Sequence, residues 1–150
     1  MYKELIKDKK GFTLLELLLV VAIIAILAGI VILALTPTKQ ISGANDIQRT
    51  IDVNTIMNSV QQYAINNNGS FPSEITNTST EICTTGAVSC AGLINLSVLT
   101  DGKTFLTTMP EDPSGEIDTN GTGYEIFVDI NGEVTVAAPQ AETASISVTK

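Results

Sequence analysis

The sequence predicts an α+β fold in which a long N-terminal α-helix packs on a small antiparallel β-sheet. Three observations predict it. Nothing polar or charged occurs from Leu17 to Leu35, so the first half of the helix is apolar all round. After Pro37, apolar residues recur at helical spacing, which is typical of an amphipathic second half. Beyond residue 120, apolar and polar residues alternate on both sides of Asn131-Gly132, which is typical of paired strands.

The apolar block is long enough to cross a membrane. Its 19 residues would span about 29 Å as a helix, which matches the roughly 30 Å hydrocarbon core of a bilayer. A buried core helix seldom runs this far without a polar residue, so we expect a transmembrane helix within residues 12–36. Pro37 lacks a backbone donor and should kink or interrupt the helix.

Charge differs between the two sides of this block. Four of the eight basic residues precede Gly11 with only two acids, whereas the chain after Gly11 carries 4 basic and 14 acidic residues. The positive-inside rule therefore predicts a cytoplasmic N-terminus and an exported body. The acidic body lacks the clustered Lys and Arg that phosphate-backbone binding requires, so no direct nucleic-acid binding is expected. The charged residues before Gly11 are Lys3, Glu4, Lys7, Asp8, Lys9 and Lys10.

Residues 37–68 are predicted to form the amphipathic half of the helix. Apolar residues recur there at steps of three to five, as in a helix that buries one face. Gly69 should provide a left-handed C-terminal cap. The predicted buried face consists of Ile41, Ala44, Ile47, Ile51, Ile56, Val60, Tyr63 and Ala64. The predicted solvent face includes Asn45, Gln48, Arg49, Asp52 and Gln61.

Residues 69–150 are predicted to form a loop followed by the antiparallel sheet. The segment 73–92 is rich in Thr, Ser and Asn without periodicity, so we expect a surface loop, and a short helix should follow around 93–99. Met109 to Gly115 contains two prolines and should form a rigid turn.

The predicted sheet begins with a strand around residues 124–130. Tyr124, Ile126, Val128 and Ile130 form one of its faces, and Glu125, Phe127 and Asp129 form the other. Asn131-Gly132 predicts a two-residue hairpin turn. A second strand runs through Val134 and Val136, and residues 145–148 would either add a third strand or fray.

Two cysteines, Cys83 and Cys90, lie in the Thr/Gly/Ser-rich loop, outside the cytoplasm by the predicted topology. Disulfides persist in such compartments. Free thiols or a two-ligand metal site are the alternatives. The chain has no histidine and no further cysteine, so a zinc site would need carboxylates. A disulfide that closes a short loop is therefore favoured.

The sequence offers no catalytic set, and we predict that the protein is not an enzyme. Without histidine there is no Ser-His-Asp or Cys-His arrangement. The glycines do not form a phosphate-binding motif, and no cofactor is expected.

The segment Lys10-Gly11-Phe12-Thr13-Leu14-Leu15-Glu16-Leu17, directly before the apolar block, resembles the class III signal of type IV prepilins and pseudopilins. This resemblance implies a cytoplasmic-side cut between Gly11 and Phe12, which would make residues 1–11 a cleaved leader, and N-methylation of Phe12. It implies that Glu16, four residues later, acts in assembly. The implied partners are a prepilin peptidase/methyltransferase, an inner-membrane assembly platform and a homo-polymer of pilin subunits.

Two further segments resemble pilins. They are the helix end from Tyr63 to Gly69-Ser70-Phe71-Pro72 and the "P-x-D-P" element Pro110 to Pro113. The chain departs from many pilins because its apolar block holds no proline, only Gly29 as a weak helix former. Some major pseudopilins bind calcium in a loop where this chain places Glu111, Asp112, Glu116 and Asp118, but EF-hand spacing is missing and we assign no metal.

The predicted function is that of a structural subunit. The resemblance implies a single-pass membrane precursor that becomes part of an extracellular or envelope-spanning filament, for adhesion, motility or DNA uptake. One alternative is a pseudopilin of a type II secretion or competence system. Another is a membrane-anchored monomeric domain, for which the specific signal before the apolar block would be unnecessary.

Overall fold

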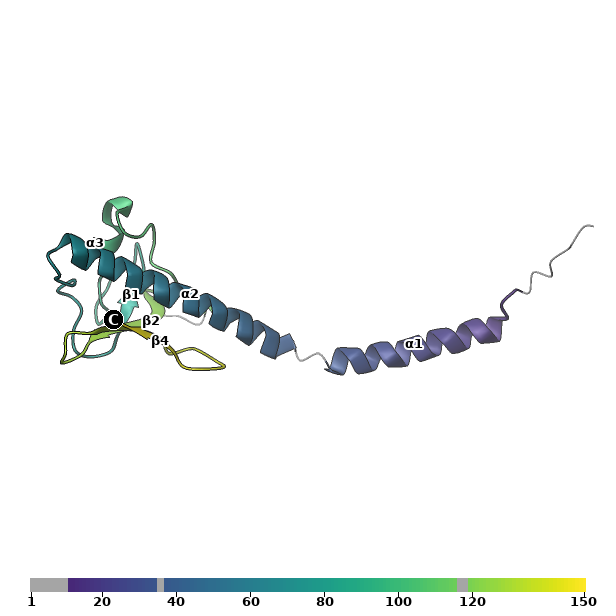
Figure 1. The fold of residues 1–150 in the computed structure, drawn as a ribbon. Helices are drawn as coiled ribbons and strands as arrows, with labels where there is room; N and C mark the ends of the chain where they lie inside the picture. The colour runs from purple at the N-terminus through teal and green to yellow at the C-terminus, as the bar shows by residue number, and fades with distance from the viewer. Residues whose placement is uncertain (1–10, 35–36, 116–118) are drawn as a thin grey trace, which may run out of the picture. The chain divides into compact units, whose positions relative to one another are not determined.

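The computed structural model describes residues 11–34, 37–115 and 119–150 (Figure 1). The chain divides into two compact units, Met1–Pro37 and Thr38–Lys150, and we name the second the head unit. The elements in chain order are α1 (Leu14–Ala34), α2 (Pro37–Asn66), β1 (Thr80–Cys83), α3 (Ser97–Thr100), the 3-10 helix η1 (Asp101–Lys103), β2 (Gly121–Val128), β3 (Val134–Ala138) and β4 (Ile146–Thr149). The predicted α+β fold is confirmed.

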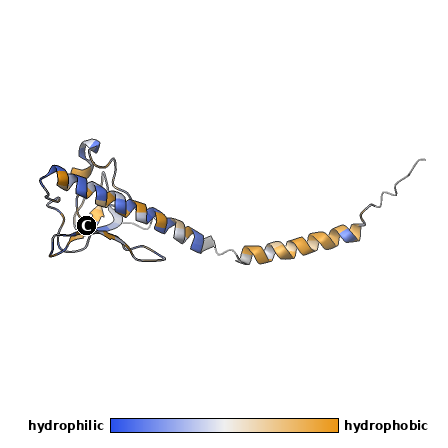
Figure 2. Ribbon diagram, viewed as in Figure 1, coloured by the Kyte–Doolittle hydropathy of each residue, from blue (hydrophilic) through white to orange (hydrophobic). Residues whose placement is uncertain are grey.

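Helix α1 is apolar on nearly every side, as the hydropathy colouring shows (Figure 2). All of its side chains from Leu14 to Ile32 are exposed. This stretch of 19 residues has a mean hydropathy of 3.1 and is the one candidate membrane span among the described residues. The lysines expected on its cytoplasmic side fall within residues 1–10, outside the described part of the chain.

Helix α2 begins at Pro37, where a proline is suited to the first helical position because its missing N–H would have no partner there. Residues 35–36, between the two helices, lie outside the described residues. At the other end, Gly69 adopts a φ of 85° and its N–H donates to the carbonyl of Ala64 at 2.7 Å. The predicted left-handed glycine at the end of the helix is therefore observed.

The core of the head unit lies between the C-terminal half of α2 and one face of the sheet. The buried side chains of α2 follow a helical period, and those of β2 and β3 alternate along their strands. The fully buried residues of this contact are Val53, Ile56, Met57 and Val60 from α2, and Tyr124, Ile126, Val134 and Val136 from the sheet.

The predicted buried face is wrong for the N-terminal half of α2. Four predicted core residues are exposed, among them Ile41 at 61%, Ile47 at 66% and Ile51 at 53%. We name this exposed set the isoleucine stripe; it consists of Ile41, Ala44, Ile47 and Ile51. The buried side chains in this half are instead those of Asp46, Arg49 and Asp52.

Helix geometry explains the error. From Ile51 to Ile56 the apolar pattern makes a step of five residues, which turns it by about 140° around the helix axis. A straight helix can bury only one of the two apolar stripes. The apolar residues from Ile56 onward pack against the sheet, so the isoleucine stripe faces outward.

The sheet has the order β1-β2-β3-β4, and all of its neighbouring strands are antiparallel. Strand β4 confirms the third strand that residues 145–148 would add. Strand β1 was not predicted, because its four residues are too few to show a clear alternation within the segment expected to be a loop. Ile94 covers the outer edge of β1, since Cys83 donates its N–H to the Ile94 carbonyl at 2.9 Å.

The hairpin between β2 and β3 has a three-residue loop, so the predicted two-residue turn is wrong. Asp129 and Glu133 still pair, through an N–H···O bond of 2.9 Å, and the loop between them ends at Gly132 with a φ of 85°. The Asp129 carboxylate accepts the N–H groups of Asn131 and Glu133, each at 2.8 Å. These bonds hold Asn131 out of the left-handed region that a two-residue turn requires.

Candidate functional site

The processing and assembly residues predicted from the sequence lie together at the start of α1, and we name Gly11 to Glu16 the processing segment. Gly11 to Thr13 precede the helix, and Phe12 is 81% exposed. Thr13 caps the helix, because its Oγ1 accepts the backbone N–H of Glu16 at 3.2 Å and its carbonyl accepts the N–H of Leu17 at 3.2 Å. Thr-x-x-Glu at a helix start is the capping-box pattern.

Glu16 is the acidic residue in the first turn of α1. A carboxylate there interacts favourably with the positive end of the helix dipole. Its side chain is exposed and has no hydrogen-bond or ion-pair partner among the described residues. An exposed acid therefore lies at the N-terminal end of an otherwise apolar helix.

A second feature, missed at the sequence level, is a buried group of charges around Arg49. The Arg49 side chain is 1% exposed. Its Nε donates to Oδ2 of Asp112 at 2.7 Å and its Nη2 to Oδ1 at 2.9 Å, which is the bidentate geometry of a strong arginine–carboxylate pair. Nη1 donates to Asp46 Oδ1 at 2.9 Å and to Glu142 Oε1 at 3.4 Å. We name these four residues, Arg49, Asp46, Asp112 and Glu142, the Arg49 cluster.

The cluster ties α2 to the loop between β3 and β4. Asp46 accepts the backbone N–H groups of Glu142 at 3.0 Å and Thr143 at 2.7 Å, and also the Thr143 hydroxyl. The Ser42 hydroxyl donates to Glu142. The carboxylate of Asp46, on α2, and that of Glu142, in the loop between β3 and β4, therefore each accept hydrogen bonds from more than one donor.

Asp52 extends these polar contacts toward the sheet. Its Oδ2 accepts the hydroxyl of Tyr124 at 2.8 Å, and its Oδ1 accepts the side-chain amide of Gln48 at 2.8 Å. Every buried side-chain nitrogen and oxygen among the described residues has a partner, as burial of polar groups requires.

The cluster is fully charged at neutral pH. Burial raises the pKa of Asp112, but hydrogen bonds from Arg49 and Ser114 outweigh it and hold the pKa below its ordinary value. Hydrogen bonds from Thr143 and the Glu142 amide lower the pKa of Asp46. The bond to Asp112 raises the pKa of Arg49. Burial, followed by the bond to Asp52, raises the pKa of Tyr124, which stays neutral.

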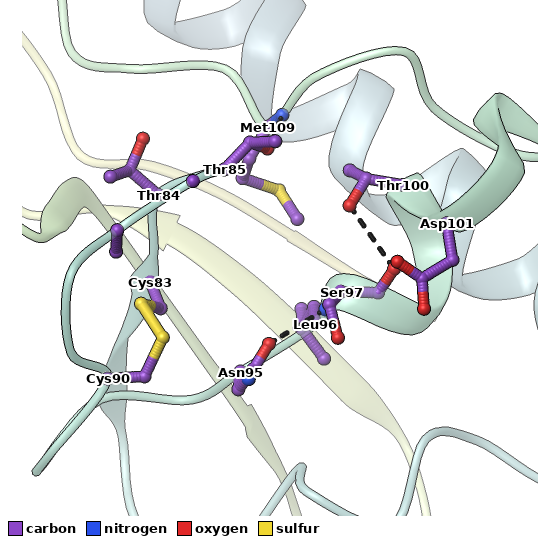
Figure 3. Close-up of a pocket in the computed structure, with 12 residues that line it drawn as sticks. Cys83, Thr84, Thr85, Cys90, Asn95, Leu96, Ser97, Thr100, Asp101 and Met109 are labelled. Carbon is purple, nitrogen blue, oxygen red and sulfur yellow. Dashed lines mark hydrogen bonds between the residues drawn. A yellow bond between two sulfur atoms is a disulfide. The ribbon is translucent and has the colours of Figure 1, made fainter.

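The disulfide between Cys83 and Cys90 belongs to the head unit (Figure 3). It joins the end of β1 to the following loop and borders a cavity of about 250 Å³. Thr85 holds this loop on the turn at residue 109, because its hydroxyl accepts the Met109 N–H at 2.8 Å.

No group of three possible metal ligands occurs among the residues that the structure describes. Asp112 belongs to the acidic loop that was compared with calcium sites, and its carboxylate is paired with Arg49. The Glu111 carboxylate accepts a hydrogen bond from the Thr84 hydroxyl. Glu116 and Asp118 lie outside the described residues.

Comparison with known proteins bears on the N-terminal segment. Residues 6–32 match the family described as the prokaryotic N-terminal methylation motif. Over 62 residues the chain is 44% identical to the type IV wide pilus major component PilA4 of Thermus thermophilus. The resemblance to type IV pilins is confirmed. The aligned region covers 41% of this pilin-like chain and 46% of PilA4, so the chain spans about half the length of that curated relative. No solved structure matches this pilin-like chain.

Proposed function

We propose that this chain is the structural subunit of a type IV pilus-like filament that acts in adhesion, motility or DNA uptake. It is stored as a single-pass membrane precursor with a cytoplasmic N-terminus. A prepilin peptidase/methyltransferase removes residues 1–11 and methylates Phe12, and an inner-membrane assembly platform adds the subunit to a homo-polymer outside the cytoplasm. The observation that carries this proposal is the methylation motif at residues 6–32 joined to a helix that is apolar on nearly every side.

Assembly follows from where α1 can be buried. Its 19-residue apolar span is exposed on every side within its own unit, and a lipid bilayer or other apolar helices would cover it. Moving α1 from lipid into a bundle of identical helices keeps this surface away from water. The head units then form the outside of the filament.

Glu16 gives the bundle a specific register. Cleavage after Gly11 would create an α-amine on Phe12, which is largely cationic at neutral pH. In a dry filament core an unpaired charge is strongly disfavoured, so the amine of one subunit pairs with the Glu16 carboxylate of another. The exposed position of this carboxylate in the first turn of an apolar helix supports the assignment.

The isoleucine stripe supports polymerisation from the head unit. Its isoleucines are more than half exposed on one side of α2, whereas an exported monomer would gain stability by burying or replacing them. A neighbouring subunit would cover this surface.

Glu16→Ala tests the assembly role. The N–H of residue 16 would still reach Thr13, so α1 should start normally. Membrane insertion should be at least as efficient, because the substitution removes an acid from the edge of the membrane span. Surface filament yield at matched membrane levels should fall at least tenfold. The control is Glu74→Ala, which removes an exposed acid of the head unit and should leave yield unchanged. A wild-type yield from Glu16→Ala would sink the pairing scheme.

Two measurements on the wild type test the function itself. Intact mass should show a mature N-terminus at methylated Phe12, and electron microscopy of sheared cell surfaces should show filaments of this chain. Short fibres seen only when the chain is overproduced, with secretion or DNA uptake lost on deletion, would favour a pseudopilin, which shares the motif. An uncut Met1 start would leave a membrane-anchored monomeric domain.

A further inference from the structure

The two halves of α2 are held to the head unit by different interactions. From Val53 to Ala64 the buried side chains are almost all apolar and belong to the core. From Lys39 to Asp52, every buried side chain is charged: Asp46, Arg49 and Asp52. No buried apolar side chain attaches this described part of the N-terminal half to the rest of the head unit.

Hydrophobic burial alone would favour a different arrangement of this half. If α2 bent near Asp52, the isoleucine stripe could turn toward the head unit and the acids could face water. The observed arrangement instead exposes isoleucines and buries three charged side chains. Other interactions must therefore offset the free energy lost by leaving the isoleucine stripe exposed.

The Arg49 cluster supplies that offset at the right place. The Arg49 fork binds Asp112 from a turn 63 residues away, and Asp46, one helical turn earlier, binds the loop at residues 142–143. These contacts approach α2 from the side opposite to the stripe, because positions 46 and 49 point away from positions 47 and 51 on a helical wheel.

We propose that the Arg49 cluster is a positioning device that holds the N-terminal half of α2 in line with its C-terminal half and so fixes the isoleucine stripe outward. Arg49 is the positioning residue, and the stripe is the surface that it presents. The use of this surface by a second copy of the chain rests on the proposed function. The positioning itself does not.

Hydrogen exchange with mass spectrometry on the full chain in detergent micelles tests the positioning. Arg49→Ala removes the fork and should increase exchange of the amides of residues 41–52 at least tenfold, because a detached segment of about 12 residues is a marginal helix. Residues 53–66 should keep wild-type exchange, since their apolar contacts are intact. Lys39→Ala is the matched control, because it removes an exposed positive charge from the same half of α2, and it should exchange like the wild type.

The double variant Arg49→Met/Asp112→Leu separates positioning from general destabilisation. Removing both Arg49 and Asp112 leaves neither of these two charges unpaired, and apolar side chains of similar size can take their place. Asp46 loses its bond to Arg49 but keeps the backbone N–H groups of Glu142 and Thr143. This variant should restore protection of residues 41–52. Wild-type exchange in Arg49→Ala, or loss of protection throughout the head unit in both variants, would overturn the proposal.

Filament yield tests whether the positioning by Arg49 matters for assembly. Arg49→Ala should reduce yield although Phe12 and Glu16 are unchanged, and the double variant should restore it. If the wild-type chain forms no filaments, the proposed function fails while the exchange result still decides the positioning.

Discussion

Replacing Ile47 and Ile51 together by glutamine should leave the head unit folded and weaken filament assembly. The two side chains are 66% and 53% exposed. Full burial of an isoleucine contributes about 1.5–3 kcal/mol, so covering the remaining surface of both contributes roughly 2–3 kcal/mol per subunit. Each 1.4 kcal/mol is about tenfold in an equilibrium constant, and subunit addition should therefore weaken by roughly 30- to 140-fold.

The assay is surface filament yield at matched membrane levels, with thermal unfolding of the full chain in micelles to check the head unit. Ile130→Gln is the matched control, because Ile130 is 99% exposed at the hairpin and the substitution makes the same chemical change away from the stripe. Wild-type yield from the double variant would refute the reasoning, as would equal losses from the double variant and the control.

Two further predictions concern stability. Replacing both Cys83 and Cys90 by serine should lower the free energy of unfolding by roughly 2–3 kcal/mol, because the disulfide no longer restricts the unfolded chain. Urea unfolding measures this loss. Thiol labelling of the wild-type protein at both positions would contradict the disulfide. The Arg49 cluster should make stability depend on acid pH. The folded pKa of Asp112 lies below its ordinary value of 3.8, so its contribution is complete well above pH 3.8 and is lost as pH falls through the lower folded value. The urea midpoint should stay constant from pH 7 to about pH 5 and fall below about pH 4, less steeply in Asp112→Asn; a midpoint that is flat to about pH 2 would exclude this linkage.

The features that could be predicted from sequence are those encoded in short, contiguous stretches. The apolar block, the glycine cap at Gly69 and the strands around Tyr124 and Val136 each follow from a local period or a turn residue. The processing segment is of the same kind, because its residues lie within one or two turns of chain. Their roles in cleavage and assembly stay predictions.

The features that could not be predicted depend on partners far away in the chain. Arg49 was assigned to the solvent face because charged residues are usually exposed, and nothing near it indicates a pairing with Asp112. The isoleucine stripe was assigned to the core because local apolar spacing does not show which of two stripes the sheet will cover. One sequence signal could have indicated this pairing. Asp46 and Asp52 lie three residues before and after Arg49, and this spacing places all three charges near one side of a helix.

The wide sequence separation of the Arg49 contacts also bears on the order of folding. The β2–β3 hairpin closes a short loop, and β4 joins β3 soon afterwards in the chain, so these pairings cost little chain entropy. Arg49 instead meets residues 63 and 93 positions away, and contacts of that range form slowly. We expect β2, β3 and β4 to pair first and the N-terminal half of α2 to dock last. Under the proposed function, a newly exported subunit would present the isoleucine stripe only at the end of folding, so there would be an interval in which it could not yet join a filament.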